Sequence, residues 1–259
     1  MSNIHPTAIV GAGAELASDV EVGPYAIIGP DVKIGEGTVV QAHAYVSGHT
    51  TIGKQCEIFP FACVGTKTQD LKYKAGDVTY VEVGDKTVLR EFSTVHSGTR
   101  PGEVTKVGSR CLIMAYCHIA HGCRVGDDVI MSNLASLAGE VTIEEHAIIA
   151  GMAGVHQFCR IGAYAMVCAT AKIRQDCPPY MMIDSSTGDT RVIGPNIVGL
   201  QRNGFSAEAR SALKEAYRLI YREGLNRSQA LERIKYEIEP LPEIQRLMRF
   251  YAESQRGVH

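Results

Sequence analysis

Aliphatic side chains recur at every sixth position along most of this chain. The series runs without a break from Ile4 to Val64, returns between Val83 and Val95, and runs again from Val107 to Ile173. A second series of small residues stands two positions before the aliphatic ones, so both series point to the same side of an extended segment. Each hexad therefore predicts a short strand and a turn. Stacked hexads predict an all-β parallel β-helix with one continuous core.

The hexad frame breaks at two places and then ends. The breaks, at residues 66–80 and about 100–105, predict loops that leave the coil; loops of this kind often carry function, although a tolerated surface loop is the alternative. After Pro178 and Pro179 the hexads stop, and helical stripes follow Ser206, Ser228 and Pro242. The sequence thus predicts a β-helix over residues 1–190 and a small C-terminal α-helical domain over residues 191–259.

Charge and composition narrow the range of functions. The chain carries 26 Lys and Arg residues against 28 Asp and Glu residues, which argues against a nucleic-acid partner. The tail is modestly basic, which suits either an acidic protein partner or an ordinary solvated surface. No signal peptide and no membrane-spanning apolar run are apparent, so a cytoplasmic protein is expected. Its eight cysteines are expected to be reduced thiols that fill small core positions.

Several histidines stand outside the inward-facing positions of the hexads. The hexads resemble those of the hexapeptide-repeat acyltransferases, in which three hexads make a coil of 18 residues. With such a coil, His121, Gly139 and Gln157 occupy the same position in three successive coils, about 4.8 Å apart. One wall thus presents an imidazole, a bare backbone and an amide in a line, with His118 and His156 beside them. A lone surface histidine usually has no special role, but a stacked set next to a glycine is a candidate site.

Six short segments carry a resemblance to a known family. They are His118–His121, Leu137–Gly139, Val155–Cys159, Gln69–Tyr73, Gln175–Tyr180 and Gly199–Ser206. Each is weak alone, but in this order and across nearly the whole chain they resemble the acyl-[acyl-carrier-protein]–UDP-N-acetylglucosamine O-acyltransferases, which are hexapeptide-repeat acyltransferases. The resemblance implies a left-handed β-helix, a homotrimer with its sites between subunits, and the first committed step of lipid A synthesis.

The activity that the resemblance implies is transfer of an (R)-3-hydroxyacyl group from acyl carrier protein to the 3-hydroxyl of UDP-N-acetylglucosamine. A neutral imidazole can take the proton of the attacking hydroxyl and return it to the departing thiol, and His121 matches the family's base. Gly139 matches the position of the backbone donor to the tetrahedral oxyanion. No metal and no cofactor are expected besides the carrier-protein thioester.

Binding roles carry over from the family in the same way. Asp70, Lys72, His118 and His156 correspond to contacts with the sugar and phosphate, and Gln157 to a contact with the nucleotide. Asn196 and Arg202 correspond to the uridine diphosphate end, and a charged arginine is a reasonable partner for a diphosphate. Ala169 matches the position in the acyl groove that limits acyl length, where a small residue permits a longer chain.

Three positions depart from the family pattern. Gly122 stands where many members have an acidic residue directly after the base, so the orientation of His121 must come from elsewhere. Glu140 stands where histidine is common; it is either a contact to the sugar or a catalytic neighbour, or a solvated corner carboxylate. Asn203 stands where a second arginine is common. These departures leave open a 3-amino analogue of the sugar, which would yield an amide.

Three rival interpretations are weaker. A γ-type carbonic anhydrase would hold zinc with three histidines such as His96, His118 and His121, but the spacing of the last two differs from that family and the helical tail is unexplained. The later N-acyltransferase of the same pathway normally has an additional N-terminal domain. A non-catalytic hexapeptide scaffold would have no need for His121 beside Gly139.

Overall fold

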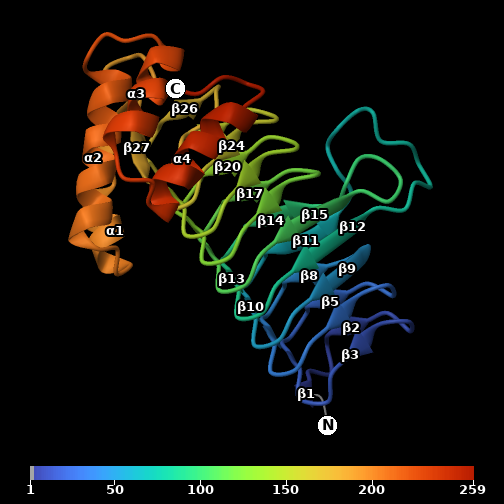
Figure 1. Cartoon of the computed structure of the whole chain (residues 1–259). Coiled ribbons are helices and arrows are strands. Elements are labelled where there is room, and N and C mark those ends of the chain that lie inside the picture. Colours follow the sequence, from blue (N-terminus) through green and yellow to red (C-terminus); the bar gives the residue numbers. More distant parts are fainter. Residues whose placement is uncertain (1–2) are drawn as a thin grey trace.

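The computed structural model describes residues 3–259 and forms a three-walled prism closed at its C-terminal end by helices (Figure 1). Hydrogen-bonded neighbours within a wall are parallel, apart from one antiparallel pair at the end of the first wall, and in most coils lie 18 residues apart, as in the pairing of His118 with Ser136. The predicted left-handed parallel β-helix with a small C-terminal α-helical domain is confirmed.

Each wall is one sheet of short strands. The first wall contains β1 (Asn3–Ile4), β4 (Glu21–Val22), β7 (Val39–Val40), β10 (Glu57–Ile58), β13 (Val88–Leu89), β16 (Leu112–Ile113), β19 (Ile130–Met131), β22 (Ile148–Ile149), β25 (Met166–Val167), β27 (Met181–Asp184) and β28 (Arg191–Pro195). The second wall contains β2 (Ile9–Val10), β5 (Ile27–Ile28), β8 (Tyr45–Val46), β11 (Cys63–Thr66), β14 (Thr94–His96), β17 (His118–Ile119), β20 (Ser136–Leu137), β23 (Gly154–Val155) and β26 (Lys172–Ile173). The third wall contains β3 (Glu15–Leu16), β6 (Lys33–Ile34), β9 (His49–Ile52), β12 (Tyr80–Val83), β15 (Val104–Val107), β18 (Arg124–Val125), β21 (Thr142–Ile143) and β24 (Arg160–Ile161).

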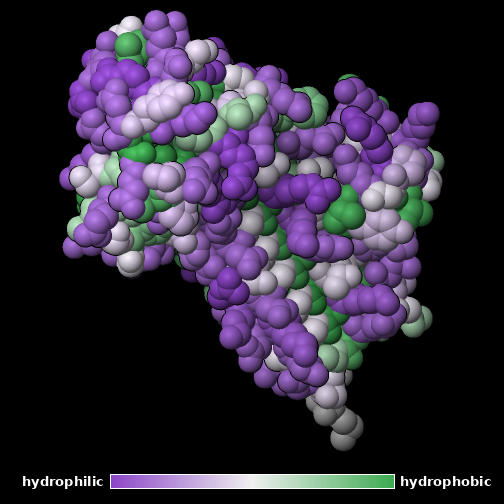
Figure 2. Space-filling view, in the orientation of Figure 1, coloured by the Kyte–Doolittle hydropathy of each residue, from purple (hydrophilic) through white to green (hydrophobic). Residues whose placement is uncertain are grey.

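The core of the prism is the stack of aliphatic residues that the six-residue frame predicts. These positions are buried from Val22 through Ile173, whereas the first three, Ile4, Val10 and Leu16, are only partly covered at the open end. Six cysteines in the small-residue series are buried, and all eight are free thiols. The outer surface is mainly polar, with a band of apolar surface along the visible side of the prism (Figure 2).

Three columns of corners join the walls, and each is named here after one residue. The His121 corner joins the second wall to the third, the Asp128 corner joins the third wall to the first, and the Tyr116 corner joins the first wall to the second. Corner residues in left-handed backbone conformation recur through the stack, with φ of 61° at Tyr116 and 57° at Asp128.

Both inserted loops leave the prism at the His121 corner. The first runs over residues 67–79 between β11 and β12, and the second over residues 97–103 between β14 and β15, so they project side by side from the prism (Figure 1). The second loop starts earlier than the expected 100–105, because strand β14 ends at His96 and the Ser97 N–H then donates to the Thr66 carbonyl.

The C-terminal part contains four helices: α1 (Ile197–Arg202), α2 (Ala207–Tyr221), α3 (Arg227–Glu237) and α4 (Pro242–Glu253). Ser206 caps α2 as the sequence predicts, whereas α3 begins one residue before Ser228, with Asn226 and Gln229 forming a capping box. Strand β28 pairs antiparallel with β27, so residues 191–195 belong to the first wall rather than to the helices. Within residues 3–259, no helix has the length and apolar character needed to cross a membrane.

Candidate active site

His121 lies at the corner named after it, between β17 and β18, and its side chain is 11% exposed. Gly139 holds the same place one coil further on, where the Glu140 N–H donates to the His121 carbonyl oxygen at 2.9 Å. A Cβ added to Gly139 would lie 2.2 Å from His121 Nε2, so only glycine fits against this ring. The stack that the 18-residue coil predicts therefore places Nε2 against a bare backbone.

Asp70 from the first inserted loop faces the same nitrogen. Its Oδ2 lies 3.4 Å from His121 Nε2, and the Thr99 hydroxyl in the second loop donates to it at 3.4 Å. The backbone N–H of Lys72 donates to Asp70 Oδ1 at 3.0 Å, and this bond is the main cause that lowers the pKa of the Asp70 carboxyl. The Lys72 side chain itself is exposed. The loop thus folds back and brings a carboxylate to the imidazole.

The rings of His118 and His96 form a pair next to His121. The rings meet edge to face with centroids 4.8 Å apart, and His118 Nδ1 shares a hydrogen bond of 2.7 Å with the Thr94 hydroxyl. Burial lowers the pKa of His96 to about 4. The pKa of His118 is also lowered, mainly by burial and to a smaller extent by the charge of the nearby His121. Both rings are therefore neutral near pH 7 and can accept or donate a hydrogen bond without carrying charge.

Two further carboxylates flank His121. Glu103, from the second loop, has Oε2 4.0 Å from His121 Nδ1, and Glu140 lies one coil above with Oε1 3.5 Å from an Arg100 nitrogen. Glu103, His121 and Glu140 are the group within residues 3–259 whose ligand atoms lie close enough together to hold a metal. The histidines of the anhydrase interpretation form no such group in that part of the chain. No sequence pattern points to Glu103, because it lies in an aperiodic loop.

His156 and Gln157 lie two coils above His118 and His121. His156 Nδ1 lies 3.2 Å from an Arg256 guanidinium nitrogen, and Gln157 is half-buried with its side chain unpaired among the described residues. A hollow of about 410 Å³ opens on the second wall between His118 and His156, and Lys172 and Arg174 add positive charge to its lining. This wall can receive an anionic, hydrogen-bonding ligand next to His121.

Asn196, Arg202 and Ala169 lie away from this cluster in the chain. Asn196 is buried at the start of α1, where its Oδ1 accepts from the Gly199 N–H at 3.2 Å and its Nδ2 donates to the Tyr164 carbonyl at 3.0 Å. Arg202 is exposed in the last turn of α1. Because Tyr164 belongs to the Asp128 corner, both residues lie at a different corner from His121. Ala169 is exposed at the Tyr116 corner.

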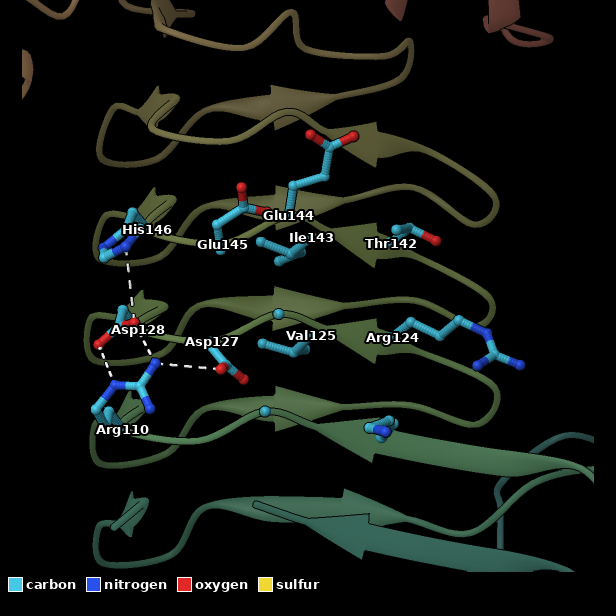
Figure 3. A pocket seen from close by; sticks show the side chains of 13 residues that line it. Arg110, Arg124, Val125, Asp127, Asp128, Thr142, Ile143, Glu144, Glu145 and His146 are labelled. Atoms are coloured by element: carbon cyan, nitrogen blue, oxygen red, sulfur yellow. Dashed lines mark hydrogen bonds and ion pairs between the residues drawn. The ribbon is translucent and has the colours of Figure 1, made fainter. Parts of the chain in front are cut away.

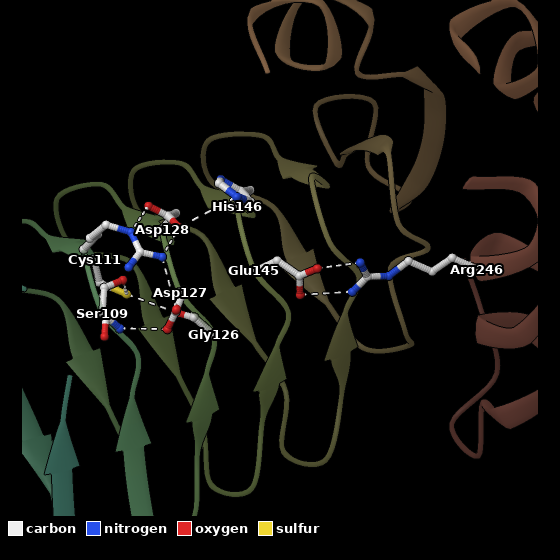
Figure 4. Close-up of polar contacts among 9 residues, drawn as sticks. Ser109, Cys111, Gly126, Asp127, Asp128, Glu145, His146 and Arg246 are labelled. Carbon is white, nitrogen blue, oxygen red and sulfur yellow. Dashed lines mark hydrogen bonds and ion pairs between the residues drawn. The ribbon is translucent and has the colours of Figure 1, made fainter. Parts of the chain in front are cut away.

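A separate hollow on the third wall is lined by charged residues, and those at its Asp128 corner pair with one another (Figure 3). Arg110 contacts Asp127 at 3.1 Å and Asp128 at 2.7 Å, and these bonds and the carboxylate charges raise the pKa of its guanidinium. Further up the same corner, Glu145 is bound by Arg246 from α4 (Figure 4). These contacts stabilise the prism and attach the helices, and they leave His121 as the centre of the candidate site.

Models of known protein families match two parts of this chain, and full-length relatives match nearly all of it. A model of the bacterial transferase hexapeptide matches residues 105–139, and a model of UDP-N-acetylglucosamine O-acyltransferase, domain 2, matches residues 176–259. The acyl-[acyl-carrier-protein]–UDP-N-acetylglucosamine O-acyltransferase of Thiobacillus denitrificans is 48% identical to this chain, and the match covers 100% of this chain and 99% of the relative. The same enzyme of Syntrophobacter fumaroxidans is 46% identical, and the match covers 98% of each chain.

A solved structure also shares the fold of the whole chain. The UDP-N-acetylglucosamine acyltransferase of Francisella novicida superposes with a TM-score of 0.94 at 37% identity, covering 98% of this chain and 93% of that one. Sequence identity of this order over the full length, together with a histidine packed against a bare glycine, excludes the anhydrase and scaffold interpretations. The chain belongs to the acyl-[acyl-carrier-protein]–UDP-N-acetylglucosamine O-acyltransferase family of enzymes.

Proposed function

We propose that this enzyme transfers an (R)-3-hydroxyacyl group from acyl carrier protein to the 3-hydroxyl of UDP-N-acetylglucosamine, as the first step of lipid A synthesis in the cytoplasm. The observation that carries the proposal is the packing of His121 Nε2 against Gly139, with Asp70 Oδ2 at 3.4 Å on the open side. A sugar hydroxyl that docks beside Asp70 lies within reach of a base and of a bare backbone.

His121 acts as the general base in this proposal. As the 3-hydroxyl oxygen attacks the thioester carbon, His121 Nε2 takes its proton, and the carbonyl π electrons move to the oxygen. The Gly139 N–H, which has no hydrogen-bond partner among the described residues, is available to donate to that oxyanion. When the tetrahedral intermediate collapses, the carbon–sulfur bond breaks and the proton passes from Nε2 to the departing sulfur.

The remaining groups at the site bind substrates rather than react. His118 and His156 line the hollow on the second wall beside His121 and suit the sugar and its phosphates. Lys72 on the first inserted loop and Gln157 two coils above His121 are assigned to the same ligand. The chemistry needs no metal, because the nucleophile's proton is removed by imidazole and the leaving thiolate is already a good leaving group. The donor needs no resident cofactor, since its acyl group arrives as a carrier-protein thioester.

A homotrimer completes the site in this proposal. Arg202 and Asn196 lie at the Asp128 corner, so a single chain does not bring them to its own His121, whereas a neighbouring copy can present that corner to it. An exposed column of rings along the Tyr116 corner also favours contact with other copies. Tyr25, Phe61, Phe92 and Tyr116 are each more than two-fifths exposed there.

The acyl chain follows the prism away from His121 towards the Tyr116 corner. Ala169 lies at that corner, two coils above Asn133 in the same column, with an exposed small side chain. A methyl group leaves the groove open at this point, so the proposal includes a preference for longer acyl chains than a bulky residue at position 169 would accept.

Acyl transfer by the purified enzyme tests the proposed function. The substrates are a series of 3-hydroxyacyl carrier proteins with UDP-N-acetylglucosamine or with its 3-amino analogue, a choice that Glu140 beside the base leaves for experiment. His121→Ala is expected to lower kcat by at least about 100-fold, in the range of general-base catalysis. His5→Ala, an exposed histidine at the other end of the prism, is the matched control and keeps wild-type kcat. Transfer to neither sugar, or full activity in His121→Ala, would refute the proposal.

A further inference from the structure

The two ring nitrogens of His121 have different surroundings. Nε2 faces Asp70 and Gly139, whereas Nδ1 is buried and has no hydrogen-bond partner among the described residues. A neutral imidazole carries its proton on only one nitrogen, so Nε2 is free to act as a base only if the proton sits on Nδ1. A group that holds the proton on Nδ1 therefore controls how much of the enzyme is ready to react.

Glu103 is the acidic group on the Nδ1 side. It is the last residue of the second inserted loop, its side chain is 15% exposed, and its Oε2 lies 4.0 Å from Nδ1. The backbone N–H groups of Thr99 and Arg100 donate to the same oxygen and hold the carboxylate in place. A carboxylate oxygen has further lone pairs to accept a proton donor, so these two bonds do not exhaust it.

Gly122 makes the space that Glu103 occupies. Its φ is +66°, and its N–H donates to the Thr105 hydroxyl at 2.9 Å. A Cβ at this position would lie 3.1 Å from Glu103 Oε1 and 3.3 Å from Glu140 Cγ, tighter than side chains normally pack. The residue directly after the base thus lacks a carboxylate of its own, and a carboxylate from the loop fills the room that its missing side chain leaves.

We propose that Glu103 is a positioning residue that keeps the His121 proton on Nδ1 and stabilises the imidazolium formed during transfer. A small rotation of either side chain closes the 4.0 Å gap to a hydrogen bond. The substrate proton then enters and leaves at Nε2, the Nδ1 proton stays on Nδ1, and Glu103 stays ionised throughout. The inference rests on the proposed role of His121 as base.

The other charged groups around His121 do not take this position. Asp70 contacts Nε2 rather than Nδ1, and His118 hydrogen-bonds Thr94. Glu140 has Oε1 3.5 Å from an Arg100 nitrogen, and its carboxylate lies near the His121 ring but makes no contact with it within 4.0 Å. Glu103 is thus the carboxylate that comes within 4.0 Å of Nδ1, and its neutral isostere is the appropriate test.

Kinetics of Glu103→Gln give the first test. The change keeps size and removes charge, and it is expected to lower kcat by about 10- to 100-fold, as for other groups that orient a functional histidine, with KM for the nucleotide sugar within about twofold. Glu103→Asp, which keeps the charge on a shorter side chain, is expected to have a kcat between those of Glu103→Gln and the wild type. Glu82→Gln, on the third wall in an ion pair with Lys106, is the charge-matched control and keeps wild-type kcat.

The tautomer of His121 gives a second test that needs no turnover. Nitrogen chemical shifts of labelled histidine, assigned with His121→Ala, are expected to report a proton on Nδ1 in the wild type and a mixture of both tautomers in Glu103→Gln. A wild-type tautomer pattern in Glu103→Gln would overturn the inference, whether or not kcat falls, because Glu103 would then only hold its loop. If transfer is absent in the wild type, the tautomer still decides the role of Glu103 separately from the proposed function.

Moving the carboxylate gives a third test. In Glu103→Ala with Gly122→Asp, the close contact with Glu103 is gone and only the Glu140 side chain has to shift. Aspartate also tolerates left-handed backbone conformation better than most residues. The double variant is expected to recover at least about tenfold in kcat over Glu103→Ala alone, because the orienting carboxylate returns from the adjacent position. Recovery of this kind is not expected if Glu103 merely caps the backbone of its loop.

Discussion

At the residue scale, the proposed function gives Gly139 two roles, one steric and one polar. Its missing side chain lets His121 Nε2 approach the backbone, and its N–H is free to meet a developing negative charge. Both roles depend on the close stacking of coils, since the Glu140 N–H bonds the His121 carbonyl directly below. The neighbouring residue Glu140 has the left-handed φ of 61°, so the turn itself does not require glycine at position 139.

The variant Gly139→Ala is expected to lower kcat by more than about 100-fold, the usual cost of losing an oxyanion donor or its alignment. The added methyl group would lie 2.2 Å from Nε2 and 2.3 Å from Cε1, so the ring must swing out of the site. Steady-state kinetics measure the loss, and a thermal melt close to wild type shows that the prism is intact. Wild-type kcat in this variant would contradict the placement of the reaction at this contact.

The site residues that could be predicted from the sequence are those whose stacking follows from the 18-residue period of the coil. His121, Gly139 and Gln157 follow from an 18-residue repeat, because parallel strands in register leave no choice of neighbour. Glu103 did not follow, since its loop has no period and its contact with His121 depends on loop conformation. Asn196 was assigned to substrate from the family alone, whereas its position before a helix also makes it an N-cap, as the structure shows.

The inserted loops act at the scale of elements. The frame breaks predicted that the chain leaves the coil near residues 66 and 100, and counting hexads assigns both exits to the connection between the second and third walls. Because that connection is also the corner that holds His121, both loops deliver a carboxylate to one imidazole, Asp70 to Nε2 and Glu103 to Nδ1. The walls hold His121 on a rigid support, and the loops provide the negatively charged carboxylates beside it.

Helix α4 is attached to the prism through Arg246, which binds Glu144 at 2.8 Å and also contacts Glu145. These bonds raise the pKa of the guanidinium. Arg246→Ala is expected to lower the free energy of unfolding by about 1–2 kcal/mol, the range for part-exposed hydrogen bonds to charged groups. Urea titration followed by circular dichroism measures the change.

Arg249→Ala is the matched control for this attachment, because Arg249 lies on the exposed side of the same helix. Its free energy of unfolding is expected to stay within about 0.5 kcal/mol of wild type. Equal destabilisation by both variants would show that general helix properties, rather than the bonds to Glu144 and Glu145, attach α4 to the prism.

At the scale of the whole molecule, the prism separates residues that the proposed reaction would bring together. His121 lies at one corner, Asn196 and Arg202 at a second, and Ala169 at the third. A triangular coil cannot bend to join its corners, since each wall is a continuous ladder of parallel strands. Under the proposed function a neighbouring copy would bring a second corner to His121, which is the physical reason to expect the trimer that the family resemblance implies.

Mixed trimers test this arrangement directly. His121→Ala and Arg202→Ala are each expected to be nearly inactive, but co-expression places an intact His121 from one chain opposite an intact Arg202 from its neighbour. In a random equal mixture each residue is intact in about half of the sites, so roughly a quarter of wild-type activity is expected when the site lies between subunits of a cyclic trimer. Two different affinity tags, purified in sequence, select the mixed trimers, in which one site of the three is complete, so the selected sample is expected to have about a third of wild-type activity. If both residues served the same chain's site, no site in the mixture would be complete, and activity would stay at the level of the two parent variants.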